Sequence, residues 1–335
     1  MENNYTIFKL LNENDNDKIS DFKGYELNEI LFYINKFLLK YRSKLNTDSI
    51  NFGCEIEFEE ANLHAVEHDL GFYTFNLNNW DIKSDMTLIN GGEIATPILS
   101  NNKECFEDLK KICEIVYKYS KNLDNCSSHI HIDANYLGSK KNTWSNLFKL
   151  WVIFEDVIYR FLYGEFLTER KSIKLYARPI SNILVKQVTE LENIELYKVI
   201  SNLKDSRNMA INFQNVLDFY DFYEKNTLEF RVPNGTFDHI ILQNNINFIL
   251  HLVKFCKSDN FNYEYINYLF NNKINNMSND INILDYRKIY LEKAICLCDL
   301  IFDTNIDKIY FLRQYIKNFD IGKTTLEKAK TFTLK

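Results

Sequence analysis

Residues 51–60, NFGCEIEFEE, limit the possible folds more than any other part of the chain. Apolar and acidic residues alternate there, which is the period of a β-strand with one buried face. The apolar side chains then share one face, and Glu55 and Glu57 share the other. Neighbouring carboxylates repel each other, and a bound divalent cation removes that repulsion. The segment therefore predicts a strand on which Glu55 and Glu57 hold metal, whereas Glu59, near the end of the segment, is expected to be solvated.

The rest of the chain alternates between strand-like and helical patterns. Strands are predicted at 72–77 running into 79–85, and at 93–99, 129–134, 209–216 and 227–232, with an aromatic turn at 219–223. Helices are predicted at 26–45, 102–123, 143–163, 181–204, 238–257, 262–270, 284–301 and 305–318. The strands cluster between residues 50 and 235 and alternate in polarity, which indicates an α+β fold with an antiparallel sheet.

The distribution of these patterns predicts one catalytic domain with helical additions. We expect an N-terminal lead-in and helix at 1–47, the catalytic domain at 48–260 and a helical C-terminal extension at 261–335 that packs on it. The pattern leaves the oligomeric state open.

Charge and cysteine content disfavour several classes of protein. The net charge is −6, so we expect no nucleic-acid partner, and the absence of an apolar run near ~20 residues predicts no membrane span. The first 17 residues lack the features of a signal peptide. Seven cysteines, an odd number without a CxxC pair, argue against a disulfide framework. These features predict a cytoplasmic protein.

Three predicted strands carry a charged or imidazole pair at positions i and i+2. The pairs are Glu55/Glu57, His129/His131 and Glu229/Arg231. Glu93 follows the turn at Gly91-Gly92, and Asp85 lies in the segment before that turn. One such pair is usually a solvated surface pair or an exposed ion pair, which contributes at most about 1 kcal/mol. Their conjunction indicates one functional face.

Six short motifs follow one another between Gly53 and Thr236: G-x-E-I-E-F, W-D-x-x-S-D, G-G-E-I-x-T-P, S-x-H-I-H-I-D, R-x-x-x-x-N and L-E-F-R-x-x-x-G-T. In this order they resemble the amidoligase family of carboxylate–amine ligases. The resemblance implies a curved, mostly antiparallel sheet of glutamine-synthetase-like catalytic type, with flanking helices and a helical C-terminal region. It also implies ATP-dependent formation of an amide or peptide-like bond through an acyl phosphate.

The resemblance further implies a set of site residues. The cofactors that it implies are ATP and Mg²⁺ or Mn²⁺, and the implied partners are small-molecule or peptide carboxylate and amine substrates. The metal ligands that it implies are Glu55, Glu57, Glu93, His129 and Glu229. Arg231 would face the γ-phosphoryl group or the substrate carboxylate, and His131 would lie on the substrate side.

Other candidates follow from residue chemistry. Arg178 and Arg207 are candidate phosphate ligands because a guanidinium matches phosphate oxygens, and Asn212 follows Arg207 in its motif. Asp85 has two interpretations, activation of the incoming amine or binding of metal, and a simple turn position is equally consistent with it.

A competing motif lies in residues 64–68. His64, Glu67 and His68 spell H-x-x-E-H, the pattern of an inverted zinc-peptidase site, which would need a third metal ligand. An exposed short helix or loop explains the same residues. Two further functions are compatible with the predicted ATP and metal site: a phosphotransferase, and a non-catalytic nucleotide-binding relative.

Overall fold

The computed structural model describes residues 12, 14–47, 50–73, 80–121, 123–216, 226–278 and 282–317. Within these ranges the chain forms a six-stranded sheet in the order β2-β3-β1-β4-β6-β5, with every neighbouring pair antiparallel. The strands are β1 (Phe52–Phe58), β2 (Asp81–Ser84), β3 (Gly92–Ala95), β4 (Ser128–Asp133), β5 (Ile211–Asn212) and β6 (Thr227–Phe230). The predicted α+β class and antiparallel sheet are confirmed.

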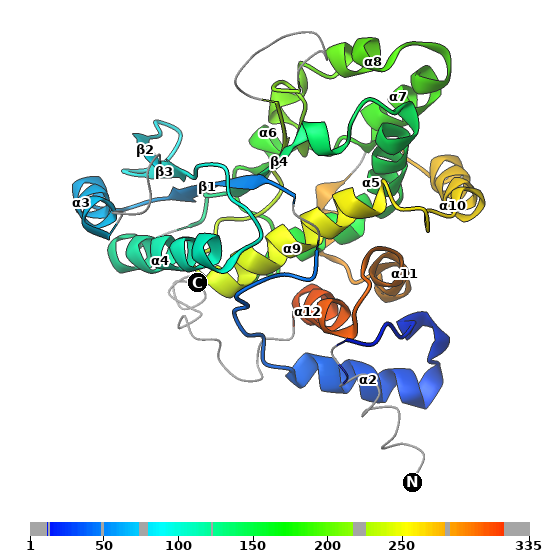
Figure 1. The fold of residues 1–335 in the computed structure, drawn as a ribbon, viewed down its shortest axis with the longest axis horizontal. Helices are drawn as coiled ribbons and strands as arrows, with labels where there is room; N and C mark the ends of the chain where they lie inside the picture. Colours follow the sequence, from blue (N-terminus) through cyan, green and yellow to red (C-terminus); the bar gives the residue numbers. More distant parts are fainter. Residues whose placement is uncertain are drawn as a thin grey trace.

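Helices surround the sheet and extend away from it (Figure 1). The α-helices are α2 (Gly24–Lys36), α3 (Leu63–Tyr73), α4 (Lys103–Tyr119), α5 (Lys141–Leu162), α6 (Ile173–Tyr176), α7 (Ser181–Asn193), α8 (Leu196–Asn202), α9 (His239–Phe255), α10 (Tyr263–Asn275), α11 (Leu291–Ile301) and α12 (Asn305–Ile316). Short 3₁₀ helices are η1 (Ile19–Asp21), η2 (Ala134–Tyr136), η3 (Ser206–Asn208) and η4 (Ile283–Arg287). Within the described ranges, no helix combines the length and the apolarity needed to cross a membrane.

One face of the sheet packs on helices. Alternate residues of β1 are buried, beginning with Phe52, whose ring stacks on Phe106 of α4 with the centroids 6.0 Å apart. Further along the sheet, Trp151 of α5 packs on Phe230 of β6 at 5.8 Å. Burying a large apolar side chain stabilises the fold by about 1.5–3 kcal/mol. Apolar burial therefore fixes which face of the strands is internal, and the acidic positions of β1 lie on the opposite face.

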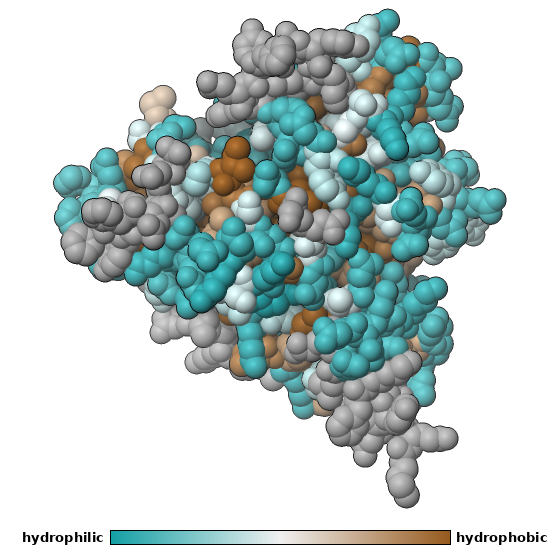
Figure 2. Space-filling view, in the orientation of Figure 1, coloured by the Kyte–Doolittle hydropathy of each residue, from teal (hydrophilic) through white to brown (hydrophobic). Residues whose placement is uncertain are grey.

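The surface of the molecule is predominantly polar on the face seen in Figure 2. Figure 2 shows hydrophilic side chains over most of the visible face, with hydrophobic ones in small areas between the elements. This distribution agrees with an apolar core that the sheet and helices enclose.

A tight turn before β3 depends on two glycines. Asn90 has a positive φ of 47°. A Cβ at Gly91 would lie 2.1 Å from the carbonyl oxygen of Phe58, and one at Gly92 would lie 2.5 Å from that of Lys83. Side chains at these positions would therefore prevent β3 from pairing between β1 and β2. The turn predicted at this point is confirmed, and it delivers Glu93 to the sheet.

The first predicted helix is shorter than expected. The prediction of 26–45 was wrong beyond Lys36, because Phe37 is extended, with ψ 129°. The ring of Phe37 lies 5.9 Å from that of Tyr310 on α12. The hydroxyl of Tyr310 also accepts from the backbone N–H of Lys40 at 2.8 Å and donates to its carbonyl at 2.9 Å. These tertiary bonds use backbone groups that a continuing helix would have occupied.

Several other boundaries differ from the prediction. The helix predicted at 181–204 is divided into α7 and α8, and the strand predicted at 209–216 is reduced to the two residues of β5. The strand predicted at 72–77 is wrong at its first two residues, which end helix α3, and residues 74–79 lie outside the described ranges. The helix predicted at 284–301 consists of η4 followed by α11, which begins only at Leu291. The aromatic turn at 219–223 also lies outside the described residues.

Candidate active site

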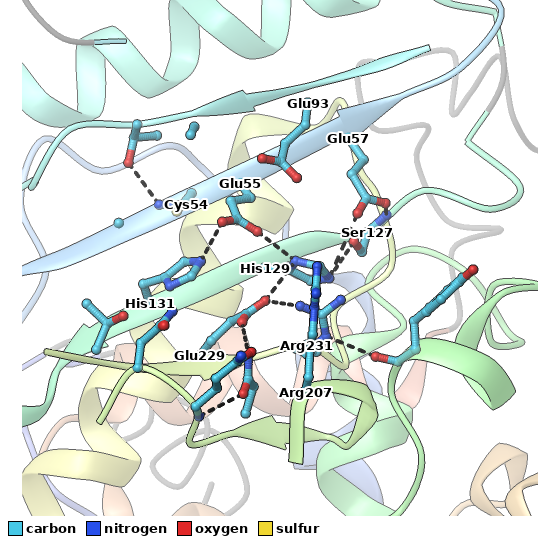
Figure 3. Close-up of a pocket in the computed structure, with 18 of the residues that line it drawn as sticks. Cys54, Glu55, Glu57, Glu93, Ser127, His129, His131, Arg207, Glu229 and Arg231 are labelled. Carbon is cyan, nitrogen blue, oxygen red and sulfur yellow. Dashed lines mark hydrogen bonds and ion pairs between the residues drawn. The ribbon is translucent and has the colours of Figure 1, made fainter. Parts of the chain in front are cut away.

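A cavity of about 930 Å³ lies over the acidic face of the sheet. Its volume is within the range that small-molecule sites usually have. Residues of β1, β3, β4, β5 and β6 line it, together with the loops that follow β2 and precede β4 and β6. Figure 3 shows the carboxylates, imidazoles and guanidinium groups of these elements converging on one space.

The strand register explains why distant residues meet here. Side chains directly opposite on neighbouring strands share a face and lie about 5 Å apart at Cβ. The opposed pairs are Glu57 with Glu93, Glu55 with His129, His131 with Glu229, and Glu229 with Asn212. The sheet itself therefore assembles the predicted acidic and imidazole residues.

One group of possible metal ligands is formed by Glu55, His129 and Glu229, whose ligand atoms lie within 4.8 Å of one another. The His129 Nδ1 atom is 2.9 Å from Glu55 Oε2 and 3.1 Å from Glu229 Oε1. Burial and Arg231 lower the pKa of His129, but bonds to the two carboxylates prevail and raise it to about 9. Burial raises the pKa of Glu229, yet His129 and Arg231 bring it down to about 2.

A second group consists of Glu57, Asp85 and Glu93, which also lie within 4.8 Å of one another. Burial, followed by the charges of Glu55 and Glu57, raises the pKa of Glu93 to about 7. The backbone N–H of Ser127 donates to Glu57 at 2.6 Å and fixes its carboxylate. Three carboxylates held this close are a donor set that a hard divalent cation stabilises.

Asp85 belongs to this second group. Of its two interpretations, the geometry favours metal binding because Glu57 and Glu93 lie beside it. The side chain also accepts from the backbone N–H and the hydroxyl of Thr87, both at 2.7 Å, so it closes the turn after β2 as well.

The cationic candidates are divided between the cavity and the surface. Arg231 lines the cavity, pairs with Glu229, and donates from Nε to the carbonyl of Tyr176 at 3.0 Å. Arg207 also lines the cavity. Arg178 is exposed and is not among the residues that line the cavity, so the structure does not bring it to the predicted phosphate position.

Two other predicted residues also line the cavity. His131 lines the cavity, and its Nε2 atom is 3.2 Å from Glu55 Oε1. Asn212 lines it as well and donates to Glu229 Oε2 at 2.6 Å. Both therefore contact residues of the first ligand group, and Asn212 positions one of its carboxylates.

Ser127 is a cavity residue that sequence reasoning missed. Its hydroxyl lies 2.7 Å from His129 Nε2, and the other ring nitrogen faces Glu55 and Glu229, which gives a Ser–His–acid geometry. A general base must be neutral, however, and a pKa of about 9 keeps this imidazole protonated near pH 7. The contact therefore orients the ring rather than activating the serine. The period of two from His129 could have identified Ser127.

Arg170 was also missed. Its buried guanidinium donates to the carbonyl oxygens of Arg231 and Val232, both at 2.9 Å, and to that of Pro233 at 3.2 Å. Burial lowers the pKa of Arg170 to about 10. The side chain thus fixes the chain that follows β6, and no local sequence pattern marks it.

Glu59 contradicts its prediction. It is fully buried rather than solvated, because its carboxylate accepts from the Nδ2 of Asn125 at 2.8 Å and from the backbone N–H of Ile89 at 3.1 Å. Two donors replace the water that a buried carboxylate loses. Glu59 therefore joins the loop after β2 to the loop before β4, next to the second ligand group.

The H-x-x-E-H residues form no comparable site. They lie on α3, where the side chains of His64, Glu67 and His68 are 92%, 63% and 73% exposed. Within the described ranges, no grouping of potential ligands includes any of them. The exposed-helix interpretation accounts for this motif.

Comparisons with known proteins give one result on the family. No curated protein matches the chain. A family model described as "Putative amidoligase enzyme" matches residues 73–253, which is more than half of the chain. The match includes β2 to β6 and their site residues, and the expected family is confirmed. The chain belongs to the amidoligase family.

Proposed function

We propose that the protein is an ATP-dependent carboxylate–amine ligase that forms an amide or peptide-like bond. Its substrates are a carboxylate and an amine, each a small molecule or a peptide. The observation that carries this proposal is the pair of adjacent ligand groups in one cavity, in a chain of the amidoligase family. Family membership supports the reaction class. The two groups of possible metal ligands support the use of divalent metal and, with it, of ATP.

The residues present suit Mg²⁺ or Mn²⁺. Five of the six candidate ligands offer carboxylate oxygens, which these ions prefer. The raised pKa of Glu93 is compatible with a cation at this point, because burial and the charges of Glu55 and Glu57 disfavour the ionised carboxylate and a bound cation would favour it. A bound divalent ion would offset the charge of the triphosphate and of the transferring phosphoryl group.

The proposed reaction has two steps. An oxygen of the carboxylate substrate attacks the γ-phosphorus of ATP, the bond to the β–γ bridging oxygen breaks, and ADP leaves. The amine nitrogen then attacks the carbonyl carbon, the carbon–oxygen bond to phosphate breaks, and the amine releases a proton. Arg231, and Arg207 on the cavity wall, would contact the phosphoryl oxygens, where developing charge is stabilised by fixed cations.

The fold and compartment form part of the same proposal. A sheet with one face on helices and the other lining a cavity is compatible with the glutamine-synthetase-like arrangement that we infer for residues 48–260. All seven cysteines are free thiols, which suits a reducing cytoplasm.

Hydroxylamine trapping tests the proposal. The protein is incubated with ATP, MgCl₂, hydroxylamine and single carboxylic acids, including the amino acids, and hydroxamate is measured with ADP. We expect hydroxamate from at least one acid in the wild type and a loss of at least about 100-fold in Glu57→Gln. Glu67→Gln, the same change on exposed α3, serves as the matched control and should retain the activity.

The outcomes separate the competing functions. ADP release that needs an acceptor but gives no hydroxamate would favour the phosphotransferase. Stoichiometric zinc that His64→Ala removes, together with peptidase activity that Glu67→Gln abolishes, would favour the zinc peptidase. Full hydroxamate formation by Glu57→Gln would show that the ligase site is misplaced.

A further inference from the structure

The two ends of the cavity differ in chemistry. Gly53 and Glu57 point to the same face of β1, and their separation along the strand is about 13 Å. The Glu57 end carries the second ligand group. At the Gly53 end, Glu229 of the first ligand group is already paired with His129 and Arg231, and Asp133 adds a further carboxylate beside several amides. We call the Gly53 end the distal half; its lining residues are Asn51, Gly53, Thr96, Pro97, Ile98, Asp133, Asn135 and Asn226.

Gly53 leaves the floor of the distal half open. Its φ is outside the positive range that favours glycine, so the backbone does not require this residue. A Cβ there would meet Thr96 Oγ1 at 3.4 Å and His131 Cβ at 3.8 Å, which are ordinary contact distances. Neither turn geometry nor close packing therefore requires glycine at this position. We attribute the absence of a side chain to the space that it leaves above the strand.

Asp133 supplies the charge of the distal half. It lies two residues after His131 on β4, and so points to the cavity face. Its Oδ1 atom accepts from the backbone N–H of Asn135 at 2.9 Å. No basic side chain in the described part of the chain pairs with it, whereas Glu55 and Glu229 of the first ligand group have such partners. A carboxylate in this setting suits a cationic ligand.

We propose that the distal half binds the amine substrate, with an ammonium group of that substrate paired to Asp133. Pro97 and Ile98, whose side chain is 80% exposed at the cavity rim, would contact an aliphatic portion of the same molecule. This assignment rests on the proposed ligase function. Asp85, the earlier candidate for contact with the amine, lies among the possible metal ligands, so the amine needs another binding position. The negative charge disfavours the triphosphate of ATP in this half, so the competing occupant is the uncharged nucleoside portion.

Asp133→Asn tests the charge while preserving the turn. An asparagine Oδ1 can still accept from the N–H of Asn135, so the start of η2 is kept. Asp259→Asn, the same change at an exposed site outside the cavity, is the matched control. Binding is measured by ligand-observed NMR with ATP and MgCl₂ present, using the twenty L-amino acids and 1,4-diaminobutane as probes. This readout does not need turnover.

We expect at least one amine probe to bind the wild type and the control, and to lose about ten- to hundred-fold in affinity in Asp133→Asn. Gly53→Val should lose the same probe, because its side chain fills the floor, while its thermal midpoint stays at the wild-type value. For the amine so identified, a ligase assay should show KM for the amine raised in Asp133→Asn and KM for ATP unchanged.

Three results would overturn the proposal. The first is that no amine probe binds the wild type, and the second is that a bound probe binds Asp133→Asn equally well. The third is a selective rise of KM for ATP in Asp133→Asn, which would assign the distal half to the nucleoside. If hydroxamate forms normally while these results appear, the ligase function stands and only the amine assignment fails. If amine binding follows Asp133 but no hydroxamate ever forms, the ligase chemistry fails instead.

Discussion

Replacing Glu93 with glutamine should stabilise the protein when metal is absent. Glu93 on β3 lies directly opposite Glu57 on the neighbouring strand β1. Carboxylate oxygens of Glu93, Glu57 and Asp85 lie within 4.8 Å of one another. Glutamine keeps the shape of the side chain and removes one of three crowded charges. The same change removes a candidate ligand, so the stabilising effect should reverse when Mg²⁺ or Mn²⁺ is added.

The magnitude follows from the pKa of Glu93. A rise from 4.5 to about 7 corresponds to about 3 kcal/mol of free energy by which the folded protein disfavours the ionised form. Glu93 is only partly buried, so solvent screening reduces the expected gain in unfolding free energy to about 1–2 kcal/mol.

The gain depends on pH in a defined direction. Below pH 4.5 the carboxyl is protonated in the folded and unfolded states, so the substitution should be neutral. Between pH 4.5 and about 7 only the unfolded state releases the proton, and the wild type loses stability relative to Glu93→Gln as pH rises. Above about pH 7 the carboxyl is ionised in both states, and the difference in unfolding free energy between Glu93→Gln and the wild type reaches its full value.

Urea unfolding with EDTA at pH 4.5 and pH 8, repeated with MnCl₂, measures these differences. Glu114→Gln, an exposed change on α4, is the matched control and should stay within about 0.5 kcal/mol of the wild type. The reasoning is refuted if Glu93→Gln is no more stable than the wild type at pH 8 without metal. It is also refuted if MnCl₂ stabilises both proteins equally.

Three further predictions concern other positions. Ser127→Ala should lower ligase turnover by less than about 10-fold, because the serine only orients His129; a loss near the 10⁶-fold typical of a removed nucleophile would contradict this. His251→Leu should raise the unfolding free energy by about 1 kcal/mol in chemical denaturation, since both ring nitrogens are buried without a hydrogen-bond partner, and a lower value would show that the imidazole is satisfied in solution. Glu155→Ala should cost about 3–5 kcal/mol, because this buried carboxylate accepts from Trp151, Tyr286 and the first backbone N–H groups of α7. Glu155→Gln should recover much of that loss, and equal stability of Glu155→Ala and the wild type would contradict the bonding.

Local periodicity predicted which face of the strands carries the candidate ligands. Alternation in β1 placed Glu55 and Glu57 on the face opposite Phe52, and the same rule placed His129 with His131. Strand polarity is a local property because burial of one face selects it. Which candidate ligands contact one another depends on the register between neighbouring strands, and local periodicity does not give that register. The order of the family motifs was needed to predict that these residues share one site.

Tertiary contacts account for what the sequence did not predict. The helical pattern after Lys36 is real, but Tyr310, distant in sequence, captures the backbone of Lys40 instead. Nothing local distinguishes Glu59 from a solvated acid at the end of a strand. Its burial depends on hydrogen-bond donors from two distant loops, the backbone N–H of Ile89 and the side-chain amide of Asn125. Arg170 donates to three backbone carbonyls and to the hydroxyl of Ser172, and the positions of these acceptors depend on the finished fold.

The origin of the cavity walls has a consequence for how such a protein can diversify. Glu57 and Glu93 are set by the sheet ladder and the glycine turn, whereas Pro97, Ile98 and Asn135 lie in connecting segments after strands end. Connecting segments tolerate substitution better than paired strands. We therefore expect a combinatorial library at positions 96–98 and 135 to vary the accepted amine while the residues of the Glu57 end stay unchanged.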